Sequence, residues 1–238
     1  MILYITKWMA WGKERMIFMF HYVEDKFFLK RAQNWCSELM KELEVSLRDA
    51  GLNSQYFLVG SGARNMVTQN EEEPIDFDYN LNIISCDDFA DCKSIKELVR
   101  KHLNFVLRNH KLLDADDSTS SLTTKPIYFK DSNRDEFSID ICIVTTDDRG
   151  MWLRLKHEKG KNSYYDKYYW NEAPNSKIYS EKADKIKLVS GWWEEVRRHY
   201  LEIKNKYLTK NEYNHPSFIC YIEAINDVYN QMKQKKLI

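Results

Sequence analysis

Apolar residues recur at two different periods along the first half of the chain, and the two periods predict different elements. In residues 25–50 they return every three or four positions, which places them on one face of a helix, and Gly51 follows as a stop signal. Between Ile75 and Ile84 they alternate with polar residues, which is typical of a strand with one buried face. A second helix is predicted from Ser94, where Ser-Ile-Lys-Glu has the form of a capping box.

Shorter apolar runs predict further strands around these elements. Residues 55–60 are apolar and aromatic and end in glycine, so we expect a buried strand there. Residues 126–130 and 137–145 are predicted as two strands joined by a polar hairpin turn at 131–136. Residues 114–124 are rich in Asp, Ser and Thr and are predicted as a loop.

The pattern changes after about residue 150. Residues 151–179 are aromatic and basic without a regular period, and two helices are predicted near 180–208 and 216–234. The predicted fold class is α+β, a mixed or antiparallel sheet core flanked by helices and followed by a helical lobe. The expected parts are an apolar N-terminal arm (1–24), a core (25–150) and a helical C-terminal lobe (151–238).

Composition adds limits on partners. Lys plus Arg and Asp plus Glu both number 36, so no overall field attracts long nucleic acid, although a local patch around 151–170 could bind it. The five cysteines are scattered without a C-x-x-C pair, which argues against a disulfide framework or a zinc site and favours a cytoplasmic location. Charged residues interrupt the apolar N-terminal twenty residues, so we expect no membrane span and no membrane partner.

Three aspartates carry the candidate chemistry. Asp76 and Asp78 are two apart on a predicted strand, so both leave the same face, roughly 6–7 Å apart at Cα. Carboxylates aimed at one point repel each other unless a cation lies between them, and oxygen ligands suit Mg²⁺. Asp140 sits between Ile139 and Ile141 on another predicted strand. The simpler alternative is that all three are solvated carboxylates on an exposed sheet face.

The order of these features resembles a known pattern. Leu58-Val59-Gly60-Ser61, then Ile75-Asp76-Phe77-Asp78-Tyr79, then Ser138-Ile139-Asp140-Ile141, is similar to the motif set of the DNA polymerase beta-like nucleotidyltransferase superfamily. Within it the chain looks most like the branch of oligoadenylate synthases, cyclic GMP-AMP synthase and bacterial cyclic-oligonucleotide synthases. The chain is short for that branch, and 14 residues separate Ser61 from Asp76, a gap at the long end.

The resemblance implies a two-metal displacement at the α-phosphate of a nucleoside triphosphate. Asp76, Asp78 and Asp140 would bind two Mg²⁺ or Mn²⁺ ions and act as the catalytic residues. Gly60 and Ser61 would hold the nucleotide phosphates, because glycine lets the backbone approach them and serine offers donors.

Four further residues are candidates for nucleotide binding, each with a simpler alternative. Arg64 follows the Gly-Ser pair and could reach a phosphate, as could Lys182 or Lys185 in the C-terminal lobe, but all three could be solvated surface side chains. Tyr168 belongs to an aromatic cluster that could stack on a base, or could pack between the lobes.

The predicted function is a metal-dependent nucleotidyltransferase that moves a nucleoside monophosphate from a triphosphate to an acceptor hydroxyl, and synthesis of a nucleotide second messenger is one reaction of this kind. The acceptor stays open between a nucleotide, a protein, an RNA end and a small molecule, and the sequence gives no oligomeric state. Alternatives are a catalytically silent nucleotide-binding regulator of the same fold, a metal-dependent nuclease and an unrelated α+β domain.

Overall fold

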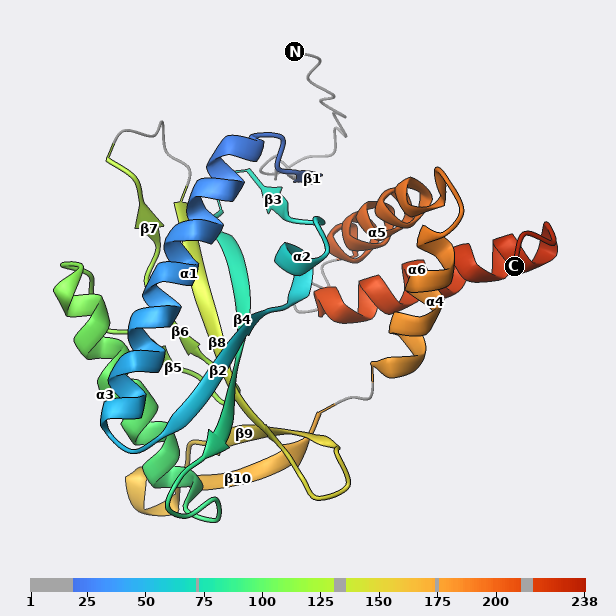
Figure 1. Cartoon of the computed structure of the whole chain (residues 1–238). Helices are drawn as coiled ribbons and strands as arrows, with labels where there is room; N and C mark the ends of the chain where they lie inside the picture. The colour runs from blue at the N-terminus through green and yellow to red at the C-terminus, as the bar shows by residue number, and fades with distance from the viewer. Residues whose placement is uncertain (1–18, 72, 131–135, 174–175, 211–215) are drawn as a thin grey trace.

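A mixed β-sheet forms the centre of the molecule (Figure 1). The structure is a computed structural model, and it describes residues 19–71, 73–130, 136–173, 176–210 and 216–238. The main path of the sheet has the order β10-β9-β8-β4-β2, and three short strands, β5, β6 and β7, join it at one side. The predicted α+β class with a mixed sheet is confirmed.

Two helices cover one face of the sheet. α1 (Lys26–Asp49) and α3 (Cys92–Asn109) both present apolar faces to it and enclose the larger hydrophobic core. Asp25 caps α1 by accepting a hydrogen bond from the Phe28 N–H at 2.9 Å. α3 begins earlier than predicted, because Asp91 is its cap and accepts from the backbone N–H of Ser94 at 3.0 Å.

The strand periodicity predicted the centre of the sheet correctly. β4 (Ile75–Ser85) alternates buried and more exposed residues, and β8 (Glu136–Thr146) lies beside it in parallel. β2 (Asn53–Leu58) pairs antiparallel with the other edge of β4. Phe77, Ile139 and the other odd-numbered apolar residues of β4 and β8 face α1 and α3, so the even-numbered residues face the other way.

Residues 114–124 are not simply a loop. They contain β5 (Asp116–Asp117) and β6 (Leu122–Thr123), which pair with each other as a hairpin. β6 and then β7 (Ile127–Tyr128) pair with β8. Strands of two residues are too short to show any periodicity, so pattern reasoning could not find them. The turn predicted at 131–136 lies almost wholly outside the described residues.

The prediction that the sheet ends near residue 150 is wrong. β9 (Trp152–Glu158) pairs with β8, and β10 (Lys167–Glu172) pairs with β9 after a short 3-10 turn, η1 (Ser163–Tyr165). The apolar face of β9 holds only Leu153 and Leu155 before His157, and aromatic residues occupy both faces of β10, so neither strand shows the long alternation that marks β4.

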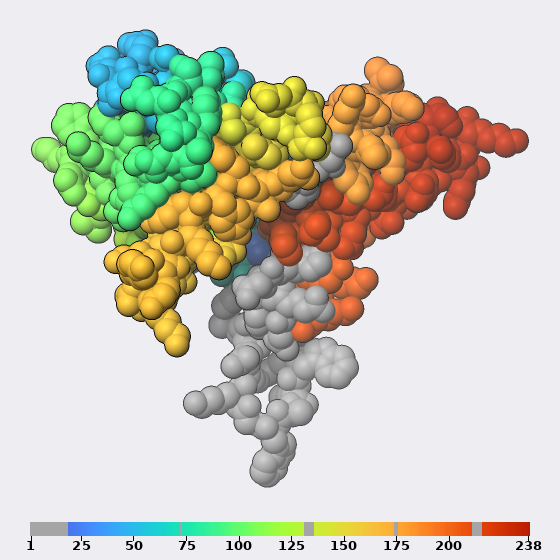
Figure 2. Space-filling model, turned by 90° about the horizontal axis from the view of Figure 1, so that it is seen from below, coloured from blue at the N-terminus to red at the C-terminus, as the bar shows by residue number. Residues whose placement is uncertain are grey.

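The C-terminal lobe has three helices, α4 (Lys177–Lys187), α5 (Trp192–Thr209) and α6 (Ser217–Gln234). The single helix predicted near 180–208 is interrupted just before Gly191, whose φ of 81° ends a helical path. These helices share a separate apolar core and project to one side of the sheet domain in orange and red (Figure 2).

The N-terminal strand joins the two parts. β1 (Phe20–Tyr22) pairs with β3 (Thr68–Asn70), and the buried Asn205 side chain of α5 bonds both backbone groups of Phe20, at 2.7 and 3.0 Å. Most of the predicted N-terminal arm, residues 1–18, lies outside the described part of the chain. Within the described part, every helix is too short or too polar to cross a bilayer.

Candidate active site

Adjacent parallel strands bring the three aspartates onto one sheet face. Asp76 and Asp78 leave β4 on the side opposite α1 and α3, as the alternation predicts. In the β4–β8 register Asp76 lies beside Ser138, and Asp78 lies beside Asp140. Neighbouring strands are about 4.8 Å apart, so the Asp78 and Asp140 carboxylates start from adjacent backbone positions.

Two of these carboxylates accept hydrogen bonds from neighbouring hydroxyls. Ser138 Oγ of β8 donates to Asp76, and Thr123 Oγ1 of β6 donates to Asp140. Ser138 shares the polar face of β8 with Asp140, so alternation could have identified it. Thr123 could not be found in that way, because its strand has only two residues.

Burial and mutual repulsion make it unfavourable for all three aspartates to be ionised at once. The pKa of Asp78 is raised to about 6, first by burial and then by the carboxylates of Asp140 and Asp76, while Arg64 and Arg154 oppose the rise. The pKa of Asp140 is also raised by burial, with Thr123 opposing. A bound cation would relieve this repulsion, so the charge on this face suits a cation-binding site.

Gly60 lies directly against Asp78. The Val59 N–H donates to the Asp78 carbonyl at 2.8 Å, which ties the turn before α2 (Gly60–Ala63) to β4. Gly60 has a φ of +64°, and a Cβ there would lie 2.1 Å from Asp78 Oδ2. Two independent constraints thus require glycine: a left-handed backbone and the close carboxylate. Ser61 follows in the same turn, half-buried.

Arg64 lies beside this turn, at the join with the helical lobe. Its Nη1 donates to the Gly60 carbonyl at 2.8 Å, and its Cζ lies 4.2 Å from the centre of the Tyr221 ring. Its charge lowers the pKa of Asp78, so it is close enough to act on the aspartates electrostatically. The structure therefore places Arg64 next to the site rather than in bulk solvent.

Lys204 of α5 also belongs to this neighbourhood, although no sequence pattern pointed to it. Its Nζ donates to Thr68 Oγ1 at 2.8 Å and lies 3.9 Å from the Phe20 ring centre. Burial lowers its pKa, and the carboxylates of Asp76 and Asp78 are near enough to act in the opposite direction. Several lysines and arginines share α5, so no spacing singles this one out.

The remaining predicted residues are placed elsewhere. Lys182 donates to Asn226 at 2.6 Å within the helical lobe, and Lys185 is exposed on α4. Tyr168 pairs with His157 across β9 and β10 and stacks on its ring at 4.1 Å, on the face that packs against α3. It therefore faces away from the aspartates, and it packs within the sheet domain against α3 rather than between the lobes.

The donor set fits Mg²⁺ or Mn²⁺, but the side chains are not gathered around one point. Among the described residues, no three His, Cys, Asp or Glu side chains converge closely enough to hold an ion as they stand. Asp76 and Asp140 are instead turned toward hydroxyl groups. Three carboxylates with excess negative charge are nevertheless the hard oxygen ligands that these ions prefer. Each hydroxyl bond involves Oδ1 alone, so Asp76 and Asp140 each keep a second oxygen that could bind an ion.

Two hollows in the surface are lined by residues other than the three aspartates. A hollow of about 610 Å³ lies against α1 beside Phe27 and Trp35. Another, of about 460 Å³, lies at the carboxyl ends of β4 and β8 beside Asn82 and Trp170. None of the three aspartates lines either hollow. The candidate site is therefore defined by its side chains, three carboxylates on one sheet face beside the Gly60 turn.

Comparison with known proteins supports the fold. No protein-family model and no curated protein sequence matches the chain. Among solved structures, CdnC of E. coli MS115-1 with ATP is 16% identical over 85% of this chain and 61% of that chain, at a TM-score of 0.51. The CdnE cyclic dinucleotide synthase of Elizabethkingia meningoseptica, with GTP and Apcpp, is 15% identical over 84% and 69%, at 0.50.

A third similar structure is the GTP-bound form of Vibrio cholerae DncV. It is 13% identical over 87% of this chain and 52% of that chain, at a TM-score of 0.51. The predicted resemblance in fold to bacterial cyclic-oligonucleotide synthases is confirmed. The chain spans about half to two thirds of the length of these proteins.

Proposed function

We propose that this chain is a nucleotidyltransferase that moves a nucleoside monophosphate from a triphosphate to an acceptor hydroxyl. The observation that carries the proposal is the close approach of the Gly60 turn to Asp78, with Asp140 beside Asp78 on the next strand. A phosphate-binding turn and three carboxylates on one face are the parts that phosphoryl transfer needs, because positioning and charge neutralisation do most of the catalysis. The similar structures that contain ATP or GTP support a nucleoside triphosphate as the substrate.

The aspartates would bind the metal ions, and the Gly60 turn would bind the phosphates. Asp76, Asp78 and Asp140 would hold Mg²⁺ or Mn²⁺, which when bound neutralises phosphate charge and makes the attacking hydroxyl more acidic. Gly60 leaves room for the triphosphate beside Asp78, since a side chain there would fill that space. Ser61 would offer its hydroxyl and N–H to a phosphate oxygen.

Two basic side chains lie near the aspartates, one from the helical lobe and one from the Gly60 turn. Lys204 reaches from α5 toward the side of the aspartates, and Arg64 lies beside Asp78. We propose that Lys204 binds the triphosphate, because its side chain is half-buried and its ammonium is near enough to Asp76 and Asp78 to feel their charge. Arg64 would hold the turn in shape through Gly60. Lys182 and Lys185 would contact the triphosphate only if substrate binding moved the helical lobe toward the aspartates.

A direct test is to incubate the chain with each labelled nucleoside triphosphate and Mg²⁺ or Mn²⁺, and to measure pyrophosphate and new products. We expect pyrophosphate release that Asp140→Asn removes. Asp114→Asn is the matched control, since Asp114 is paired with Arg108 on the surface. Tight triphosphate binding without pyrophosphate would instead favour a silent regulator, and cleavage of nucleic acid would favour a nuclease.

Replacing Lys204 by methionine should weaken substrate binding more than it slows turnover. The change keeps most of the buried stem and removes the charge that would meet the phosphates, so KM for the triphosphate should rise about 10- to 100-fold, as expected for loss of a charged hydrogen bond. Steady-state kinetics measures this effect. Lys206→Met, at an exposed position on the same helix, is the control. An unchanged KM in Lys204→Met would remove Lys204 from the site.

A further inference from the structure

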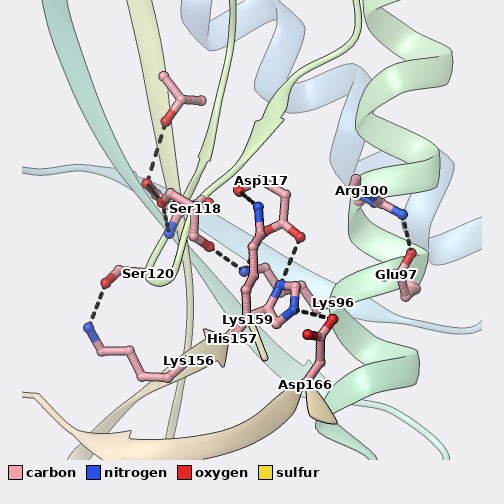
Figure 3. A network of polar contacts seen from close by, with 12 residues as sticks. Lys96, Glu97, Arg100, Asp117, Ser118, Ser120, Lys156, His157, Lys159 and Asp166 are labelled. Carbon is pink, nitrogen blue, oxygen red and sulfur yellow. Dashed lines mark hydrogen bonds and ion pairs between the residues drawn. The ribbon is translucent and has the colours of Figure 1, made fainter. Parts of the chain in front are cut away.

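Four buried ionisable side chains form a cluster outside the candidate site (Figure 3). Lys96 of α3 lies 2.7 Å from Asp117 Oδ1, and His157 Nδ1 lies 2.9 Å from Asp117 Oδ2. The other ring nitrogen of His157 lies 3.1 Å from Asp166. The four residues come from α3, β5, β9 and the segment just before β10, so the cluster joins distant parts of the sequence.

The burial of this cluster makes stability a weak explanation for it. The side chains are 3% (Lys96), 9% (Asp117), 5% (His157) and 15% (Asp166) exposed. Removing charges from water costs about as much free energy as pairing returns, so apolar residues would often stabilise such a position equally well. Apolar residues could not, however, form directional hydrogen bonds that hold a neighbouring segment in one orientation.

The cluster and its neighbours fix the turn of the β5–β6 hairpin. Lys96 Nζ also donates to the Ser118 carbonyl at 2.7 Å. The backbone N–H of His157 donates to the Thr119 carbonyl at 2.8 Å. Two further lysines of β9 and its end reach the same hairpin: Lys159 donates to the Asp117 carbonyl at 2.6 Å, and Lys156 donates to Ser120 Oγ at 2.5 Å.

This hairpin carries Thr123 to the candidate site. Thr123 lies directly across from Asp140 in the β6–β8 pairing, and its hydroxyl donates to the Asp140 carboxylate. Strands of two residues supply little pairing of their own, so an isolated hairpin of this size would not hold its place. The position of Thr123 therefore depends on the contacts made at the other end of the hairpin.

We propose that Lys96, Asp117, His157 and Asp166 are positioning residues for Asp140, acting through the β5–β6 hairpin and the Thr123 hydroxyl. The inference rests on the proposed function, in which Asp140 binds metal. Thr123 orients the carboxylate from outside the metal shell, and the cluster keeps Thr123 within reach. Such outer partners typically change metal affinity about 10- to 100-fold when they are removed.

Thr123 gives the cleanest test. Thr123→Val removes the hydroxyl with almost no change of shape, and Thr123→Ser keeps it. We expect Mn²⁺ affinity, measured by isothermal titration on the full chain, to fall about tenfold in Thr123→Val and to recover to within about twofold in Thr123→Ser. In the transfer assay, kcat should fall while KM for the triphosphate stays close to that of the wild type. Equal Mn²⁺ affinity in the wild type and Thr123→Val would overturn the proposal.

Asp117→Asn tests whether the buried cluster acts on Asp140 through the hairpin. Asp114→Asn is the matched control, because Asp114 forms an exposed ion pair with Arg108. Mn²⁺ affinity should fall in Asp117→Asn and not in the control. The double variant Asp117→Asn/Thr123→Val should bind no more weakly than Thr123→Val alone, because both changes act on one contact. Additive losses would show that Asp117 acts independently of Thr123 and would overturn its positioning role.

Amide hydrogen exchange separates this inference from the proposed function, because it needs no metal. In folded Asp117→Asn, exchange should quicken at Thr124, whose N–H bonds the Ile139 carbonyl, more than at the α1 amides. Unchanged exchange there would overturn the inference even if the variant folds poorly elsewhere. A wild-type chain that binds no Mn²⁺ and releases no pyrophosphate would overturn the proposed function, and the Asp140-positioning inference with it.

Discussion

Replacing Asp78 by asparagine should abolish nucleotidyl transfer and at the same time make the folded chain more stable. Asp78 is the carboxylate that Gly60 approaches, so its loss should lower the turnover rate at least about a thousandfold, as for other groups that stabilise transition-state charge. The same carboxylate is costly in the metal-free fold, since its pKa rises from 3.8 to about 6. That difference corresponds to about 2 to 3 kcal/mol of stability regained by the neutral amide above pH 6.

The sign of this effect gives it a definite pH dependence. Between about pH 4 and pH 6 the folded wild type holds a proton on Asp78 that the unfolded chain has lost, so wild-type stability falls as pH rises through this window. The advantage of Asp78→Asn should therefore be small near pH 4 and full above pH 6. Thermal unfolding across this range, without divalent metal, measures it.

Asp114→Asn is again the control, because Arg108 lowers the pKa of Asp114 and the same substitution there should bring no gain. Mg²⁺ or Mn²⁺ should raise the melting temperature of the wild type and leave that of Asp78→Asn almost unchanged. A stability gain in Asp78→Asn that is equal at both ends of the pH range would contradict the burial and charge argument for this face.

Sequence periodicity was sufficient for the aspartates because their strands are long and half-buried. β4 and β8 each run for 11 residues with one apolar face, which determines the face on which Asp76, Asp78 and Asp140 lie. Their adjacency is a tertiary fact that periodicity does not contain. The resemblance to nucleotidyltransferases implied a shared site, and the parallel β4–β8 pairing provides the neighbouring strands that it requires.

The contributions from outside these strands could not be predicted in the same way. Thr123 and Lys204 reach the site through pairing and packing between segments far apart in the sequence. Tyr168 illustrates the reverse case. Its aromatic and basic sequence neighbours suggested a surface on which a base could stack, but the β9–β10 register places its side chain on the face that packs against α3. Composition identifies the kinds of side chain present, whereas the pairing of β9 with β10 decides which way each one faces.

Gly60→Ala should severely damage the candidate site, although it replaces only a single hydrogen by a methyl group. The new Cβ would lie 2.1 Å from Asp78 Oδ2 and 2.9 Å from its Cγ, so the carboxylate would have to leave its position. We expect transfer to fall at least about a hundredfold, as when a 1 Å misplacement disturbs catalytic geometry. The left-handed φ of +64° should add about 1 kcal/mol of backbone strain for any residue with a Cβ.

Gly51→Ala separates these two effects. Gly51 ends α1 with a φ of +85°, and a Cβ there would meet nothing within 4 Å. It should therefore lose about 1 kcal/mol in unfolding free energy through strain alone and keep full activity. Because both variants share the strain, the extra loss in Gly60→Ala, measured by pyrophosphate release and denaturant unfolding, reports the contact with Asp78. If the two variants lost activity equally, the Gly60 turn would have no special relation to the carboxylate, and the phosphate-binding role proposed for it would fail.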